Sequence, residues 1–141
     1  MLVLLALAVL ALAGCGADDE SADGAGSEAS APEGPATSLE VTVWPTGRGN
    51  GPEHTTTLEC DPVGGTHPAP EESCAILAAS PDLLEPLPDD VMCTQQFGGP
   101  EQAWVRGTFQ GREVDLRYNR ANGCEISRWD ALAPLFKVVI G

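Results

Sequence analysis

Five cysteines constrain this chain of 141 residues more than any other feature, because the number is odd and so short a chain buries only a modest core. Cys15 stands alone near the N-terminus, and the other four are Cys60, Cys74, Cys93 and Cys124. If Cys15 has a separate use, the remaining thiols can form two disulfides in an oxidising compartment. Their spacing alone leaves three connectivities open.

A metal site is the alternative use of these thiols. Cys60, His67 and Cys74 are evenly spaced along the chain. No CxxC pair is present, however, and a disulfide-permitting compartment favours oxidation of the thiols. We therefore expect no metal ion and no cofactor.

The N-terminal segment predicts export. Residues 1–14 are almost wholly Leu, Ala and Val, which is typical of a signal peptide and too short to span a bilayer comfortably. The run ends in Leu12-Ala13-Gly14-Cys15, which resembles a bacterial lipobox, where the thiol receives a diacylglycerol. We expect a protein tethered by lipid on Cys15 to the outer face of the cell membrane, or else secreted. The alternative is that Cys15 lies in a cleaved leader and has no role.

Residues 15–37 are predicted to be a lipidated, disordered and acidic linker. They are dominated by Gly, Ala, Ser, Pro and acidic residues, with no large apolar side chain, and six carboxylates lie between Asp18 and Glu33. Such a segment cannot bury enough surface to offset the entropy of ordering. The folded domain is expected at residues 38–141.

The charge of the chain argues against nucleic acid as a partner. The formal net charge is −14, and residues 38–141 still carry fifteen acidic and seven basic side chains. An acidic surface without a basic stripe repels phosphate backbones. We expect five arginines to offset this acidic surface, with an anion site as the alternative: Arg106, Arg112, Arg117, Arg120 and Arg128.

Hydrophobic patterning predicts an α+β domain with about five antiparallel strands and two helices packed on one face. Alternation and β-branched residues indicate strands at 39–44, 55–60, 103–110, 113–118 and 135–140. Gly64-Gly65 is expected to form a turn, and Gln110-Gly111-Arg112 a hairpin. Helices are expected at 71–80, with Cys74, Leu77 and Ala78 facing the core, and at 124–132.

The segments around the four later cysteines carry a family resemblance. They are CDPVGGTHPAPEESC at 60–74, DDVMCT at 89–94, FQGREV at 109–114 and GCEI at 123–126. Over roughly residues 38–136 the chain closely resembles the bacterial subtilisin-inhibitor-like family. The resemblance implies an α+β serine protease inhibitor with bridges Cys60–Cys74 and Cys93–Cys124.

In that family the loop after the third cysteine binds the protease as a substrate would. The resemblance therefore implies a reactive bond between Gln95 and Gln96. From P4 to P2′ the implied loop reads Met92, Cys93, Thr94, Gln95, Gln96 and Phe97. As an alternative to the P4 role, Met92 could fill a core gap.

Two features depart from the family pattern. Gln95 stands where Met, Lys or Arg is usual, and about one extra residue lies near Gly98-Gly99-Pro100. Because a neutral amide cannot pair with the carboxylate of a trypsin-like pocket, we expect poor inhibition of trypsin.

The sequence thus predicts an exported, lipid-anchored inhibitor of subtilisin-type serine endopeptidases, with a subtilisin-like protease as partner. The alternative is a non-inhibitory cell-surface lipoprotein binding module on the same scaffold, since a fold alone does not fix a function. The resemblance also suggests a homodimer.

An enzyme is not expected. Neither His54 nor His67 has a nearby pattern typical of a catalytic triad, and His67 is predicted to order its loop by hydrogen bonding. The adjacent Asp89 and Asp90 are typical of a solvated turn rather than of an acid/base pair.

Overall fold

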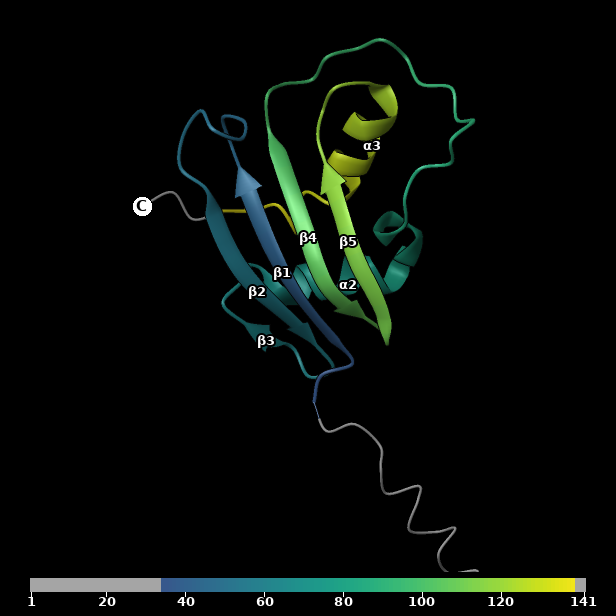
Figure 1. Cartoon of the computed structure of the whole chain (residues 1–141). Coiled ribbons are helices and arrows are strands. Elements are labelled where there is room, and N and C mark those ends of the chain that lie inside the picture. Colours follow the sequence, from purple (N-terminus) through teal and green to yellow (C-terminus); the bar gives the residue numbers. More distant parts are fainter. Residues whose placement is uncertain (1–33, 139–141) are drawn as a thin grey trace, which may run out of the picture. The chain divides into compact units, whose positions relative to one another are not determined.

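The computed structural model describes residues 34–138, so the predicted leader, Cys15 and most of the predicted linker lie outside it. Strands β1 (Thr37–Trp44), β2 (His54–Cys60), β3 (Gly64–Gly65), β4 (Gln102–Phe109) and β5 (Arg112–Tyr118) form one antiparallel sheet, in the order β3-β2-β1-β4-β5. Helices α2 (Pro70–Ala79) and α3 (Gly123–Ala131) lie on one face of it, and the short 3₁₀ helix η2 (Pro81–Leu84) follows α2 (Figure 1). The predicted α+β class is confirmed.

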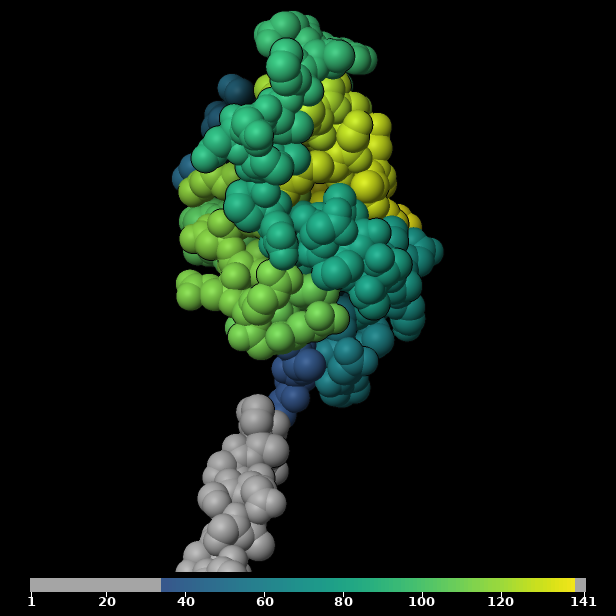
Figure 2. All heavy atoms as spheres, turned by 90° about the vertical axis from the view of Figure 1, so that its right-hand side faces the viewer, coloured from purple at the N-terminus to yellow at the C-terminus, as the bar shows by residue number. Residues whose placement is uncertain are grey.

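The connection from η2 to β4 is the longest irregular segment of the domain. Residues 85–101 run over the end of the sheet beside α3 (Figure 1) and stand out from the surface (Figure 2).

No helix among residues 34–138 is both long and apolar enough to cross a bilayer.

Strand β1 is the centre of the sheet, with β2 on one side and β4 on the other. As the alternation predicts, Leu39, Val41 and Val43 are buried against the helices. The other face of the sheet carries Glu40 and Thr42, and the Thr42 hydroxyl bonds that of Thr55 on β2 at 2.9 Å. One face therefore supplies the core, and the other is polar.

The predicted hairpin between β4 and β5 is confirmed. Phe109 pairs with Arg112, which leaves the two-residue loop Gln110-Gly111 with φ of 48° and 81°. Two positive φ values define the tight turn whose twist matches that of antiparallel strands, and glycine takes such a value without strain. Val114 and Tyr118 consequently face the core.

The fifth strand is not the predicted one. Gly64-Gly65, expected as a turn, pairs with Leu58 and Glu59 as β3. Gly65 has φ of 95°, and a Cβ there would lie 2.2 Å from the carbonyl oxygen of Thr57. Only glycine allows the backbone to approach β2 this closely, and composition alone does not reveal the pairing.

The predicted strand at 135–140 is wrong for the residues that the structure describes. Residues 132–136 form successive turns, in which the amides of Leu135 and Phe136 donate to the carbonyl of Leu132 at 2.8 and 3.3 Å. Leu132, Leu135 and Phe136 are buried in the core. Packing at this helix-like spacing overrides the β propensity of the apolar run.

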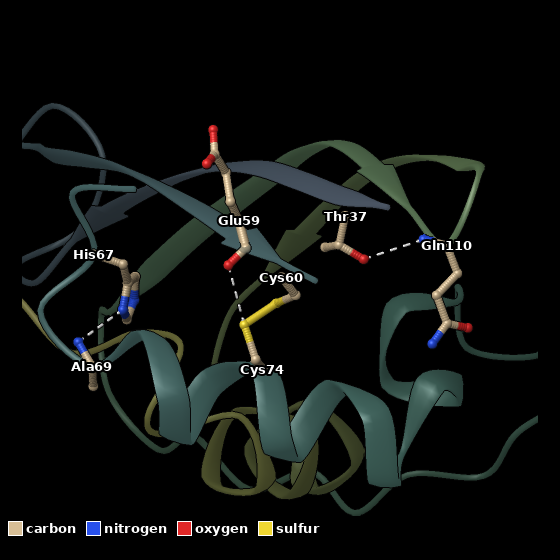
Figure 3. The surroundings of a disulfide bond; sticks show 7 residues. All are labelled: Thr37, Glu59, Cys60, His67, Ala69, Cys74 and Gln110. Carbon is tan, nitrogen blue, oxygen red and sulfur yellow. Dashed lines mark hydrogen bonds between the residues drawn. A yellow bond between two sulfur atoms is a disulfide. The ribbon is translucent and has the colours of Figure 1, made fainter. Parts of the chain in front are cut away.

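Helix α2 is tied to the sheet by the disulfide Cys60–Cys74, which joins it to the end of β2 (Figure 3). Pro70 begins the helix, and Glu71 and Glu72 in its first turn favour its positive end. Its buried face carries Ser73 and Leu77, whereas Ala78, expected in the core, is exposed. The disulfide confirms that Cys60 and Cys74 form no metal site with His67.

The predicted role of His67 as a loop-ordering residue is confirmed. Its Nδ1 accepts from the Ala69 N–H at 3.0 Å (Figure 3), so its Nε2 carries the proton and donates to the Leu135 carbonyl at 2.8 Å. His67 thereby links the entry to α2 with the C-terminal turns.

Arg128 on α3 is buried and does not serve as a surface charge. Its guanidinium donates to the carbonyls of Leu83 and Glu85 at 3.2 and 2.7 Å and lies 3.6 Å from the Glu125 carboxylate. Burial raises the pKa of Glu125 above its ordinary value, and Arg128 offsets part of that rise. Burial also raises the pKa of Tyr118 to about 12, consistent with a neutral phenol that donates to Leu83 at 2.7 Å. These bonds fasten the start of the 85–101 connection to α3.

Replacement of Arg128 is predicted to destabilise the domain more than replacement of an exposed arginine. Arg128→Met loses two charged hydrogen bonds and leaves the Glu125 carboxylate without its cation, for a loss of about 2–4 kcal/mol. Arg112→Met is the matched control, because Arg112 bonds the exposed Glu85 carboxylate at 2.9 Å and such pairs contribute about 0–1 kcal/mol. Urea denaturation of both variants measures the difference, and equal losses would contradict this account of Arg128.

Candidate functional site

The segment that contains the predicted reactive bond is the most exposed apolar part of the domain. Met92 and Phe97 are 93% and 72% exposed, and Val91 is 43% exposed. Only Val63 joins them as an exposed large apolar residue within residues 34–138. Exposed apolar side chains that cluster in this way mark a contact surface. The alternative of Met92 as a core filler is wrong.

One covalent bond anchors this segment. Cys93 is bonded to Cys124, the second residue of α3, with a Cα–Cα distance of 5.3 Å. The bond closes a loop with a sequence separation of 31, which in the chain-entropy model stabilises the fold by about 3 to 4.7 kcal/mol. Both disulfides that the resemblance implies are therefore present.

Hydrogen bonds hold the segment on both sides of the predicted reactive bond. Before it, the carbonyl of Thr94 accepts from the N–H of Gly123 at 3.1 Å. After it, Gly98 donates its N–H to the carbonyl of Arg120 at 2.7 Å and accepts from the Arg120 Nε at 3.2 Å. Between these anchors Gln95 and Gln96 are exposed and bond no described residue.

Two glycines make these close contacts possible. A Cβ on Gly98 would lie 2.7 Å from Ile126 Cγ1 and 3.2 Å from Arg120 Nε. A Cβ on Gly123 would lie 2.1 Å from the hydroxyl oxygen of Thr94. Gly98 lies near the extra residue by which the chain departs from the family pattern. It is the position at which the loop packs against Ile126 of α3.

Arg120 is a functional side chain that the sequence does not reveal, because its charge predicts a place on the surface. Only 20% of its side chain is exposed, and it bonds Asp130 on α3 at 2.8 Å as well as Gly98. Glu101 lies 3.8 Å away, at the far end of the loop. No local sequence pattern distinguishes this arginine from the exposed ones, since its partners lie on two other segments, the 85–101 connection and α3.

The base of the loop also rests on a capped helix start. Asn122 accepts the Glu125 N–H at 3.0 Å, which fixes the first turn of α3 beside Cys124 and Gly123.

The predicted solvated turn at Asp89 and Asp90 is observed, and both residues are exposed. Among residues 34–138 no cluster of His, Cys, Asp or Glu could hold a metal ion.

These features define a small disulfide-stapled α+β domain that displays one exposed segment supported at both ends. The sequence pattern described as "Subtilisin inhibitor-like" matches residues 35–122. The chain belongs to this family, whose members are protease inhibitors, and is not an enzyme.

Individual proteins with similar sequences are named as inhibitors of the same class. Subtilisin inhibitor-like protein 1 of Streptomyces cacaoi is 38% identical over 80 residues, which cover 53% of this chain and 72% of that protein. A subtilase-type protease inhibitor of Streptomyces fradiae is 36% identical over 77 residues, which cover 52% of this chain and 54% of that protein. The chain thus spans about half the length of this second relative.

A solved structure is also similar. Streptomyces caespitosus sermetstatin, in a complex with Bacillus licheniformis subtilisin, is 26% identical with a TM-score of 0.45. The match covers 72% of this chain and 97% of that one.

Gly98→Ala is predicted to release one end of the loop. The added Cβ must displace Ile126 or open the two Gly98–Arg120 hydrogen bonds, so the amide at position 98 should exchange faster with solvent. Gly64→Ala is the matched control, because its Cβ meets only the Glu59 side chain, whose flexible carboxylate is the nearest group at 3.2 Å. Amide hydrogen exchange followed by NMR measures the effect, and unchanged protection at position 98 would contradict the assigned role of Gly98.

Proposed function

We propose that the chain inhibits subtilisin-type serine endopeptidases by presenting residues 92–97 as a substrate that is held in place, with Gln95–Gln96 as the reactive bond. The observation that carries the proposal is the exposed segment anchored before the bond by Cys93–Cys124 and Thr94, and after it by Gly98. Membership in a family of protease inhibitors supports the same function.

Pre-organisation is the physical basis of the proposed inhibition. A flexible peptide loses roughly 1–2 kcal/mol of backbone entropy for each residue that a protease cleft fixes. The anchors on both sides of Gln95 remove part of that freedom during folding, so binding costs less. Tight binding then needs no covalent chemistry, since protease–inhibitor contacts of standard size include some of the tightest complexes known.

The side chains of the loop suit an apolar, extended cleft. Met92 at P4 and Phe97 at P2′ are largely exposed, and burying each in the complex would contribute up to about 1.5–3 kcal/mol. Thr94 at P2 is β-branched, which favours an extended backbone. Gln95 at P1 offers a long, uncharged and flexible side chain, which a broad subtilisin-type pocket accepts.

Slow and reversible cleavage follows from the anchors. If the protease cuts Gln95–Gln96, the disulfide retains the new carboxyl end at the start of α3. The bonds of Gly98 to Arg120 retain the new amino end. The amine therefore stays close to the acyl-enzyme and can re-form the peptide bond before water attacks.

Titration of the oxidised protein into subtilisin tests the function. Residual activity is expected to fall in proportion to added protein and to vanish near equimolar amounts. Gln95→Pro removes an N–H and restricts the backbone at P1, so inhibition should weaken by about a hundredfold or more. Gln95→Met is the matched control, because it keeps the length and flexibility of the side chain, and should still inhibit. Steady digestion of the unmodified protein would contradict the proposal and favour the non-inhibitory binding module.

We also propose that the domain is exported and held at the outer face of the cell membrane, with residues 1–14 as signal peptide and 15–37 as linker. Mass spectrometry of the membrane fraction should find acyl chains on Cys15, and Cys15→Ser should release the protein into the medium. An unmodified Cys15 in the mature protein would contradict the lipid anchor.

The pairing of two copies, which the family resemblance suggests, also stays a prediction. Sedimentation velocity measures whether the protein is a homodimer.

A further inference from the structure

The polar face of the sheet contains a cationic hollow at the end that adjoins the loop. A depression of about 270 Å³ lies where β1, β4 and β5 reach this end, and Arg48, Gln102, Arg117 and Asn119 line it. Trp44 forms part of its wall. None of these residues belongs to the loop at 92–97.

The two arginines of this hollow differ from the other basic side chains. All seven Lys and Arg residues of the chain lie within residues 34–138, and five of them have a carboxylate oxygen of a described residue within 4.0 Å. Arg48 and Arg117 have none among the described residues. Two cations without a paired carboxylate therefore share one hollow in a domain that is otherwise acidic. The carboxylates of Glu53 and Asp115 accept from Nε1 of Trp44 and Trp104 at 2.9 and 2.6 Å and do not pair with either arginine.

Aromatic rings hold both arginines in place. The guanidinium of Arg48 lies 5.5 Å from the centre of the Trp44 ring, and that of Arg117 lies 4.1 Å from the centre of the Trp104 ring. Stacking of this kind orders the side chain and leaves the edge of the guanidinium free to donate.

Two amide side chains add donors. The oxygen of Gln102 accepts the backbone N–H of Arg48 at 3.3 Å, and the oxygen of Asn119 accepts that of Ala121 at 2.8 Å. Because a backbone N–H can only donate, these bonds fix the orientation of both amides, and both NH₂ groups remain to donate. The polar side chains of the hollow thus offer donors and positive charge, which is the chemistry that recognises a carboxylate or another oxyanion.

The hollow lies close to the loop. Asn119 precedes Arg120, whose side chain and carbonyl hold Gly98. Gln102 follows Phe97 by five residues, which span at most about 17 Å when extended. A standard protease–inhibitor contact covers about 800 Å² on each partner, a patch of roughly 16 Å radius. Gln96 lies one residue further from Gln102, so the extended limit from the reactive bond is about 20 Å, and the hollow lies near the rim of such a contact, on its primed side.

We propose that Arg48 and Arg117, with Gln102 and Asn119, form a second contact site that receives a carboxylate from the surface of the bound protease. The inference rests on the proposed inhibition and adds to it a partner with an acidic side chain on the rim of its primed side. The site contributes to the association rate and to the choice of protease, whereas the loop supplies the substrate-like contact.

Inhibition of subtilisin by the full oxidised chain tests this site. Arg48→Gln combined with Arg117→Gln should weaken inhibition about tenfold at about 0.01 M salt, and the difference should shrink at about 1 M salt, where the screening length falls to about 3 Å. Arg112→Gln combined with Lys137→Gln is the matched control, because it removes the same charge from pairs with Glu85 and Glu72, outside the hollow. It should inhibit like the unmodified protein.

The outcomes separate the two proposals and the two sources of an oxyanion. Equal inhibition by the unmodified protein and the Arg48/Arg117 variant would overturn the second site and leave the proposed function standing. A failure of the unmodified protein to inhibit would overturn both. Titration of the free protein with inorganic phosphate, followed by NMR of the Gln102 and Asn119 amide groups, tests the other source. Saturable binding that the double variant loses, together with unchanged inhibition by that variant, would assign the hollow to a free anion and overturn the protease contact.

Discussion

The candidate site depends on the attachment of an exposed loop to the first turn of α3. A single turn supplies three contacts there: Cys124 bonds Cys93, the Gly123 amide donates to Thr94, and Ile126 packs beneath Gly98. The first two act before the proposed reactive bond and the third acts after it. The same few residues of α3 therefore lie on both sides of Gln95 and Gln96, which make no hydrogen bond to the described residues.

The position of the loop depends on how firmly helix α3 is packed against the rest of the domain. Two residues of α3 attach the helix to the rest of the domain. Arg128 donates to the carbonyls of Leu83 and Glu85, and the centre of the Trp129 ring lies 4.4 Å from that of the Phe136 ring. The Phe136 ring in turn lies 5.2 Å from that of Tyr118 on β5. A continuous series of packed and bonded groups thus connects the sheet to the loop, so a change in the core at Phe136 is expected to alter the loop.

Local patterns predicted much of this architecture because they depend on neighbouring residues. Alternation placed Leu39, Val41 and Val43 in the core, and Gln110-Gly111 marked the hairpin. Features set by distant contacts escaped prediction. The pairing of Gly64-Gly65 depends on β2, the turns after Leu132 depend on the core, and Arg120 differs from exposed arginines only through its partners. The disulfide partners came from the family resemblance, since spacing left three choices.

The central claim is that the two ends of a cut Gln95–Gln96 bond stay where the intact bond held them. The most direct measurement is prolonged incubation of the oxidised protein with a trace of subtilisin, followed by mass spectrometry of the intact and cleaved forms. Because held ends gain little entropy on cleavage, the account predicts one cut, between Gln95 and Gln96, and comparable amounts of both forms at equilibrium, approached from either side. Cuts at other bonds, or complete conversion to fragments, would contradict it.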